Sequence, residues 1–291
     1  MNGIIYKALS GFYYVKTESG YSYQCKGRGK LKKEKIKPLV GDRVEITTIS
    51  DDEGVIEKVL PRKNLLYRPT VANIDQMIVM VSNEQPKPDY MLMDTLLALA
   101  EHYNISALVC VTKIDLGDSV LKYVKDRLQS TNYRVLGISN QPPQGISQLK
   151  SLMEDKISCL CGQSGVGKSS LVNNLNPDAN FRVGNISTKI QRGKHTTTHS
   201  SLVEVTKNGF IVDTPGFSNL SLQDVGLKQL ANLYVDFDGF ECKFTSCTHM
   251  SEQECGVKKA VEKGQLHQDR YESYVMLNKK LKQLKERYKR G

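Results

Sequence analysis

The stretch CLCGQSGVGKSS, from Cys159 to Ser170, limits the possible folds more than any other part of this chain. It passes from small apolar residues typical of a buried strand into a glycine-rich segment, and then into residues that open a helix. A strand, a glycine-rich loop and a helix in this order form the context of a P-loop, whose backbone N–H groups point at phosphate oxygens. The stretch therefore predicts an α/β domain that binds phosphate.

The P-loop assigns a role to each of its polar residues. Its glycines let successive N–H groups curl inward, and the helix N-terminus adds a partial positive charge. Lys168 is expected to reach the β- and γ-phosphates of a nucleotide, Ser169 to ligate magnesium, and the Ser170 N–H to approach the α-phosphate. A glycine-rich turn without a ligand is the alternative. The expected contact residues are Gly162, Gln163, Ser164, Gly165, Val166, Gly167, Lys168, Ser169 and Ser170.

Two further motifs suit a nucleotide site. In VDTPG, Asp213 can hold a magnesium-bound water at a strand end, and the Gly216 N–H can contact a γ-phosphate. DTPG alone could be only a turn, but behind a P-loop it indicates a γ-phosphate sensor.

TKID, from Thr112 to Asp115, follows the apolar run ALVCV. Asp115 can accept hydrogen bonds from the N1–H and 2-amino groups of guanine, and the stem of Lys113 can cover the base. TKID alone would more often be an ordinary turn. A backbone N–H for the guanine O6 is expected at Ser139, although Asn140 replaces the usual Ala there. We expect Thr112, Lys113, Asp115 and Ser139 to contact guanine.

Three regions are predicted along the chain. Residues 1–70 contain five short alternating segments and no helical stretch, which favours an OB-type β-barrel that binds RNA. Tyrosines in these strands could stack on bases or be plain strand residues. Residues 71–222 alternate apolar strands with helices such as DYMLMDTLLALAEHY, capped by Asp89, and predict a mainly parallel sheet.

The third region, residues 223–291, contains ECKFTSCTHMSEQEC and then a long basic helical stretch. Three cysteines and one histidine within this short segment form a ligand set suited to tetrahedral zinc. Buried free thiols or a redox pair are the alternatives. The expected zinc ligands are Cys242, Cys247, His249 and Cys255.

The chain carries 41 Lys and Arg against 31 Asp and Glu, a net charge of +10, which favours a polyanionic partner. The excess is concentrated in KGRGKLKKEKIK near the start and KKLKQLKERYKR at the end. Each run could be a solvated surface, but two such runs favour nucleic acid. No export signal or membrane-spanning run is recognisable, so we expect a cytoplasmic protein without a membrane partner.

The base-reading motif precedes the P-loop, which is the reverse of the usual order. A site assembled at strand ends does not depend on chain order if the old termini could be joined, so the order indicates a circular permutation. TKID, GQSGVGKSS, RGKHTTT and DTPGF in this order resemble the circularly permuted GTPases. With the barrel and the Cys/His cluster, the whole chain resembles the bacterial ribosome small subunit-dependent GTPase family.

This resemblance implies a monomeric late assembly factor that uses GTP or GDP, Mg²⁺ and one Zn²⁺ per chain, with the small ribosomal subunit and its rRNA as partners. It supports all four zinc positions and implies that His195 orients the attacking water; an exposed loop histidine is the alternative. Thr197 is expected to contact magnesium and the γ-phosphate. Phe217 follows DTPG where many GTPases carry a water-orienting Gln.

The sequence therefore predicts a GTPase that hydrolyses GTP slowly alone and faster on the small subunit, with His195, Lys168 and Thr197 as catalytic residues. A non-catalytic RNA-binding module whose nucleotide only orders its loops is a second hypothesis. A third, an ATP-driven nucleic-acid remodeller, is disfavoured by TKID and by the lack of helicase-like repeats.

Overall fold

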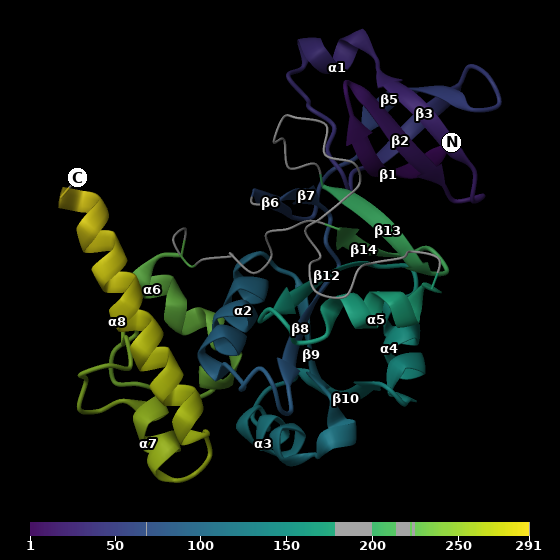
Figure 1. The fold of residues 1–291 in the computed structure, drawn as a ribbon. Coiled ribbons are helices and arrows are strands. Elements are labelled where there is room, and N and C mark those ends of the chain that lie inside the picture. The colour runs from purple at the N-terminus through teal and green to yellow at the C-terminus, as the bar shows by residue number, and fades with distance from the viewer. Residues whose placement is uncertain (68, 178–199, 214–221, 223–224, 291) are drawn as a thin grey trace. The chain divides into compact units, whose positions relative to one another are not determined.

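The structure, a computed structural model of the chain, describes residues 1–67, 69–177, 200–213, 222 and 225–290. Figure 1 shows its helices and strands along the chain, which divides into two compact units. The first unit comprises Met1–Met77, Ile146–Leu160 and Gly167–Ser218, and the second comprises Ile78–Gly145, Cys161–Val166 and Asn219–Gly291. The chain passes between the units several times, so residues distant in sequence share a unit.

Five strands of the first unit form a closed barrel. They are β1 (Asn2–Leu9), β2 (Phe12–Thr17), β3 (Ser22–Gly27), β4 (Arg43–Thr48) and β5 (Glu53–Val59). Their order is β1-β2-β3-β5-β4, and β4 pairs back onto β1, with Gly3 opposite Val44. Alternate residues point inward, which is the period of a strand with one buried face. The core residues are Ile5, Val15, Cys25, Leu31, Val44, Ile46 and Ile56.

The first unit also contains part of an α/β sheet. Strand β12 (Ile157–Gly162) pairs in parallel with β14 (Gly209–Asp213), and β14 pairs antiparallel with β13 (Ser201–Thr206). The helices here are α4 (Ile146–Met153) and α5 (Lys168–Leu175). A small hairpin of β6 (Leu65–Tyr67) and β7 (Thr70–Ala72) follows the barrel.

The second unit contains further strands of α/β type. β9 (Ser106–Thr112) and β10 (Arg134–Asn140) run parallel, and the short β11 (Pro143–Gln144) pairs antiparallel with β10. All seven residues of β8 (Gln76–Ser82) are buried, which explains their near-continuous apolar character. Helix α2 (Tyr90–His102) begins after Asp89, whose side chain accepts a hydrogen bond from the Leu92 N–H at 2.8 Å. One turn, η1 (Ile114–Leu116), and helix α3 (Ser119–Arg127) complete this part.

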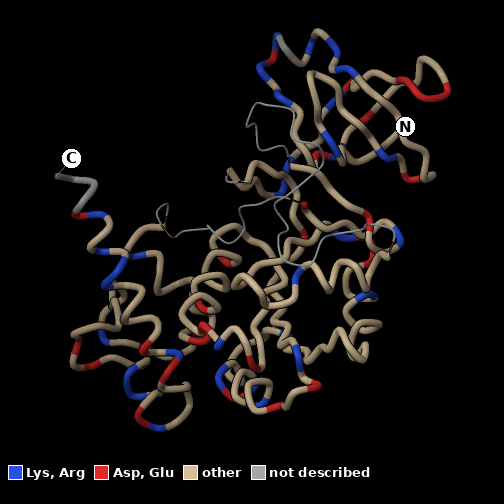
Figure 2. The backbone as a smooth tube through the Cα atoms, viewed as in Figure 1, with Lys and Arg blue, Asp and Glu red and all other residues tan. Residues whose placement is uncertain are grey.

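Short helices and one long helix form the end of the second unit. They are α6 (Leu227–Leu230), η5 (Ala231–Leu233), η6 (Val235–Phe237), α7 (Gly256–Glu262) and α8 (Gln268–Arg290). Their apolar residues form one core with Ala98 and Leu99 of α2. Figure 2 shows Lys and Arg concentrated around α1 (Gly29–Lys33) and along α8. No helix in the described part of the chain combines the length and apolar character that crossing a bilayer requires.

The structure confirms the predicted α/β fold class, with an N-terminal five-stranded barrel and a C-terminal, mainly helical part that contains the Cys/His cluster. The expectation that the barrel region lacks a helix was wrong, because α1 lies between β3 and β4. Leu31 of α1 packs into the barrel core, so tertiary packing stabilises a helix too short to form alone.

Candidate functional site

The glycine-rich segment adopts the backbone that a phosphate loop requires. Strand β12 ends at Gly162, whose φ is +138°, and a Cβ built there would lie 2.3 Å from the Met80 carbonyl oxygen. No other residue fits this position. Gly165 and Gly167 also have positive φ values of +78° and +100°. Left-handed residues between a strand and a helix turn successive N–H groups toward one side, which suits an anion.

Helix α5 opens directly after this loop. Gly167 is its N-cap, and Lys168, Ser169 and Ser170 form its first turn, where backbone N–H groups lack partners inside the helix. The Ser169 side chain is buried, and Val166, before the cap, is fully buried. Gln163 and Ser164 lie between β12 and Gly165, and Ser164 is exposed.

The TKID segment contacts the phosphate loop within the second unit. Thr112, the last residue of β9, donates a hydrogen bond from Oγ1 to the Val166 carbonyl at 2.8 Å. Lys113 has a left-handed backbone with φ of +61°, and its ammonium donates to the carbonyl oxygens of Gln85 and, at 3.5 Å, Gly165. These bonds connect two motifs that lie about fifty residues apart in the sequence.

Ser139 orients the carboxylate that sequence analysis assigns to base recognition. Buried at the end of β10, Ser139 donates from Oγ to Asp115 Oδ1 at 2.5 Å. Asp115 itself is exposed, so a ligand can reach it. Sequence reasoning expected only the backbone N–H of Ser139 to act. The sequence could have indicated this side-chain contact, since Ser139 lies at the end of a strand predicted to run parallel to β9. Parallel strands end at the same edge of a sheet, which brings the Ser139 hydroxyl near the TKID segment.

The remaining nucleotide candidates are only partly described. Asp213 ends β14 in the first unit, and burial raises the pKa of its carboxyl group. Its carboxylate and the Ser169 hydroxyl are the hard oxygen donors that Mg²⁺ prefers, so both fit the expected ion. His195, Thr197 and Gly216 lie outside the described residues.

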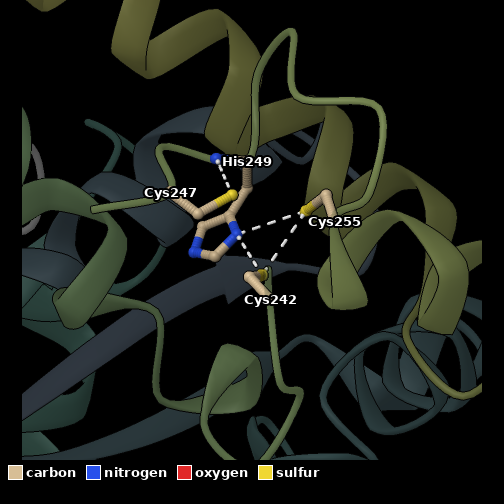
Figure 3. A group of neighbouring side chains, drawn as sticks. All are labelled: Cys242, Cys247, His249 and Cys255. Atoms are coloured by element: carbon tan, nitrogen blue, oxygen red, sulfur yellow. Dashed lines mark hydrogen bonds between the residues drawn. The ribbon is translucent and has the colours of Figure 1, made fainter. Parts of the chain in front are cut away.

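Cys242, Cys247, His249 and Cys255 converge in the second unit (Figure 3). Their ligand atoms all lie within 4.8 Å of one another. The Cys242 and Cys255 sulfurs are 3.8 Å apart, and His249 Nδ1 lies 3.5 Å from Cys242 Sγ and 3.4 Å from Cys255 Sγ. Tetrahedral zinc with ordinary bond lengths would separate two sulfurs by about 3.8 Å and a sulfur and a nitrogen by about 3.5 Å. The ligand set therefore fits zinc.

The surroundings of this cluster shift the pKa values of its ligands in both directions, and burial raises those of Cys247 and Cys255. The Gly256 N–H donates to Cys242 Sγ at 3.3 Å, and the His249 N–H donates to Cys247 Sγ at 3.4 Å. Burial would raise the pKa of Cys242, but the N–H groups of Val257 and Gly256 outweigh it and lower that pKa. Burial also lowers the pKa of His249, which keeps its imidazole neutral and able to bind a metal.

The loop that carries the ligands is anchored by other hydrogen bonds. Glu252 accepts the N–H groups of Thr248 at 2.7 Å and Met250 at 2.8 Å. Burial would raise the pKa of Glu252, but these bonds lower it to about 2. From α8, the Tyr271 hydroxyl donates to the His249 carbonyl at 2.8 Å. The cluster is therefore fixed to the long basic helix.

Comparisons with known proteins cover nearly the whole chain. The family model RsgA GTPase matches residues 59–223, and the RsgA N-terminal domain model matches residues 2–56. Two relatives, from Alkaliphilus metalliredigens and a Geobacillus species, are described as small ribosomal subunit biogenesis GTPase RsgA. They are 43% and 44% identical to the chain, over 94% and 98% of it and over 96% and 99% of their own lengths.

Two solved structures have the same fold. YjeQ from Thermotoga maritima has a TM-score of 0.85 and 36% identity, covering 96% of this chain and 98% of its own. YloQ, described as a circularly permuted GTPase, has a TM-score of 0.82 and 34% identity, covering 97% of this chain and 95% of its own. With the permuted motif order, the family models and these full-length matches in agreement, the chain belongs to the RsgA GTPase family.

Proposed function

We propose that this chain is a GTPase that binds the small ribosomal subunit and acts late in its maturation, hydrolysing GTP to GDP and phosphate. Membership of the RsgA GTPase family supports the activity and the pathway. The proposal rests on two hydrogen bonds between the TKID segment and the glycine-rich loop. The Thr112 hydroxyl donates to the Val166 carbonyl, and the Lys113 ammonium donates to the Gly165 carbonyl. These bonds support the proposal that Asp115 reads guanine and that the glycine-rich loop binds phosphate, although the two motifs occur in reverse order.

Base recognition in this proposal belongs to the Thr112–Asp115 segment. Asp115 accepts the N1–H and 2-amino groups of guanine, and the hydrogen bond from Ser139 holds its carboxylate in one orientation. Lys113, tied to two backbone carbonyls, covers the base with its stem. Adenine presents an acceptor at N1, so it leaves the carboxylate unpaired.

Phosphate binding belongs to residues 162–170. The loop N–H groups and the helix N-terminus hold the phosphates, Lys168 neutralises the β- and γ-phosphate charge, and Ser169 is the protein ligand for magnesium. A bound Mg²⁺ would neutralise charge that develops between the β- and γ-phosphates. Asp213 would hold that ion through a water molecule. Thr197 and Gly216 complete the contacts to magnesium and the γ-phosphate, and His195 orients the attacking water in place of a glutamine, because Phe217 can neither donate nor accept.

The other regions provide the ribosome-binding surfaces in this proposal. Residues 1–70 form an RNA-binding barrel, residues 71–222 the permuted GTPase domain, and residues 223–291 a zinc-binding domain with a basic helix. Cys242, Cys247, His249 and Cys255 would hold one Zn²⁺, which suits their ligand types and the closeness of their ligand atoms. The lysines of α1 and α8 contact rRNA phosphates. We further propose that the protein works as a monomer in the cytoplasm.

GTP turnover with and without purified small subunits tests this function. We expect slow hydrolysis alone and a clear increase with subunits. Lys168→Ala should weaken nucleotide binding, whereas His195→Ala should keep GTP affinity and lower the stimulated rate by about 10- to 100-fold. Nucleotide-dependent cosedimentation with subunits but no hydrolysis would favour the non-catalytic RNA-binding module instead. Equal stimulated rates for wild type and His195→Ala would remove that histidine from the mechanism.

A further inference from the structure

Asn83 directly follows β8, at the strand edge where the TKID segment lies, and its side chain is only 5% exposed. Its backbone N–H donates to the Thr112 carbonyl at 2.9 Å. Its side-chain Oδ1 accepts the N–H of Val120, in the first turn of α3, at 3.1 Å. Thr112 and Val120 border the loop of residues 113–119, which carries Asp115. One residue therefore holds both ends of that loop.

The loop is also held by the bonds of Lys113 to the Gln85 and Gly165 carbonyls and by the Ser139 hydroxyl on Asp115. It contains one helical turn, and Leu116 at the end of that turn is 60% exposed, so burial of apolar side chains contributes little there. Lys113 and Gly117 have positive φ values, +61° and +144°, which allow the chain to turn sharply over Asn83. A Cβ at Gly117 would lie 3.2 Å from Asn83 Nδ2, closer than most neighbours tolerate.

The residues beside Asn83 reinforce the same contact. Ser82 donates from Oγ to the Gln85 carbonyl at 3.0 Å, and that carbonyl also accepts the Lys113 ammonium. The turn from Ser82 to Gln85 thus contacts the loop through Lys113 as well as through Asn83. The amide Nδ2 of Asn83 has no hydrogen-bond partner among the residues that the structure describes. The hydrogen bond from the Val120 N–H to Oδ1 is therefore the contact by which this buried side chain acts on the loop.

We propose that Asn83 is a positioning residue for guanine recognition, which fixes the 113–119 loop so that Asp115 meets the base. This inference rests on the proposed function, because it gives Asn83 a role only if Asp115 reads guanine. Asn83 touches no nucleotide group itself. Replacing the Asn83 side chain should therefore act through Asp115. It should mainly reduce the share of nucleotide affinity that comes from recognition of the base.

The test compares the affinities of GTP and ITP for wild type and four variants. ITP lacks the 2-amino group, so it can use only one of the two expected hydrogen bonds to Asp115. Asn83→Leu, of similar size but without an acceptor, should lower GTP affinity about tenfold, the equivalent of one buried hydrogen bond. The affinity for ITP should fall less, so the ratio of GTP affinity to ITP affinity becomes smaller. Asn83→Asp keeps an acceptor at the N-terminus of α3 and should restore the preference.

Two further variants serve as a control for general destabilisation and as an independent change in the loop. Asn64→Leu removes a comparable side-chain clamp, in which Oδ1 accepts the Ile74 N–H at 2.9 Å and Nδ2 donates to the Ile74 carbonyl at 2.8 Å. It should leave the GTP/ITP preference unchanged. Gly117→Ala adds a methyl group that would crowd the Asn83 side chain from the exposed loop. It should reduce the preference for GTP over ITP even if Asn83→Leu does not fold.

The outcomes separate this inference from the function. Wild-type selectivity for GTP over ATP, with an unchanged GTP/ITP preference in Asn83→Leu and Gly117→Ala, would overturn the role of Asn83 alone. A parallel loss of GTP and ITP affinity in Asn83→Leu and Asn64→Leu would also overturn it, since that pattern reflects general destabilisation. Wild type without preference for GTP over ATP would instead overturn the proposed function.

Discussion

The barrel core and the helical core of the second unit are built on different principles. The barrel core consists of apolar and thiol side chains such as Val15, Cys25 and Ile56. The ion pair between Glu45 and Lys58 of its strands, at 3.8 Å, is exposed, and the one buried carboxylate beside the barrel in the described residues, Asp42, lies before β4 and pairs with the partly exposed Arg62. The helical core instead buries four charged residues completely or nearly so: Asp94, Arg127, Asp236 and Arg270.

These four charges form one connected network. Asp94 of α2 accepts hydrogen bonds from Arg127 of α3 at 2.5 Å and from Arg270 of α8 at 2.6 Å. Arg270 also donates to both oxygens of Asp236, at 3.1 and 3.2 Å, and its guanidinium lies 4.4 Å from the centre of the Tyr234 ring. Burial would lower the pKa of Arg270, but Asp94 and Asp236 outweigh it and raise that pKa.

The difference follows from how each core is assembled. Five consecutive strands with alternating apolar residues define the barrel, so non-directional burial suffices. The helical core joins α2, α3 and α8, whose contacting residues lie up to 176 positions apart in the sequence. Directional bonds between opposite charges tolerate few alternative arrangements, and we infer that the network fixes which helices meet.

Removing a zinc ligand should produce the largest effect, because the metal provides much of the folding free energy of small zinc-bound segments. Cys247→Ser should lose the roughly one zinc per chain that the wild type binds. Elemental analysis measures the metal, and hydrogen exchange should show loss of protection around α7 with GTP binding largely kept. Cys25→Ala, a buried thiol of the barrel core, is the control that should keep its zinc. A native wild-type protein without metal would contradict this prediction.

Breaking the charge network should have the next largest effect. Asp94→Ala leaves Arg127 and Arg270 without their shared buried partner, so the free energy of unfolding should fall by about 3–5 kcal/mol. Urea denaturation measures the loss. A loss below about 1 kcal/mol would mean that the network contributes little and that both cores depend on apolar packing.

Trimming the barrel core should cost less. Ile56→Val removes one fully buried methylene and should reduce the free energy of unfolding by about 0.5–1.5 kcal/mol in the same urea experiment. No charge is left unpaired, so salt should not change the loss. If Ile56→Val lowered the free energy of unfolding as much as Asp94→Ala, the proposed difference between the two cores would be contradicted.

An exposed ion pair of the barrel should contribute least. Glu45→Ala breaks the pair with Lys58, and both side chains are about half exposed or more, so the expected loss is about 0.2–1 kcal/mol. Measurements at low and high salt should show that this loss shrinks as salt screens the pair. A larger and salt-independent loss would show that surface charge stabilises the barrel.

Sequence patterns predicted the features that depend on neighbouring residues. Period-two alternation located all five barrel strands, and Asp89 marked the start of α2. The site residues of the P-loop and of TKID remain predictions, although the contacts of Thr112 and Lys113 are consistent with them. Cys242, Cys247, His249 and Cys255 were recognisable because ligand type and density are local properties.

Features that depend on tertiary contacts could not be predicted. Helix α1 lies in a basic run with no helical period, and it forms because Leu31 enters the barrel core. The bond from Ser139 to Asp115 requires two parallel strands to end together, and the role of Asn83 requires β8 to lie beneath a loop that begins thirty residues later. Asp94 and Arg270 are ordinary charged residues in the sequence, and only folding brings them together.

Competition of GTP, ATP and XTP against a fluorescent guanine nucleotide, for wild type and Asp115→Asn, tests the central claim that TKID reads guanine beside the P-loop. Two charge-assisted hydrogen bonds of about 1.5–3 kcal/mol each predict at least a roughly hundredfold preference of the wild type for GTP over ATP. Asp115→Asn should lose affinity for GTP and gain affinity for XTP, because xanthine carries a carbonyl in place of the 2-amino group. Comparable affinities of the wild type for ATP and GTP would contradict the account.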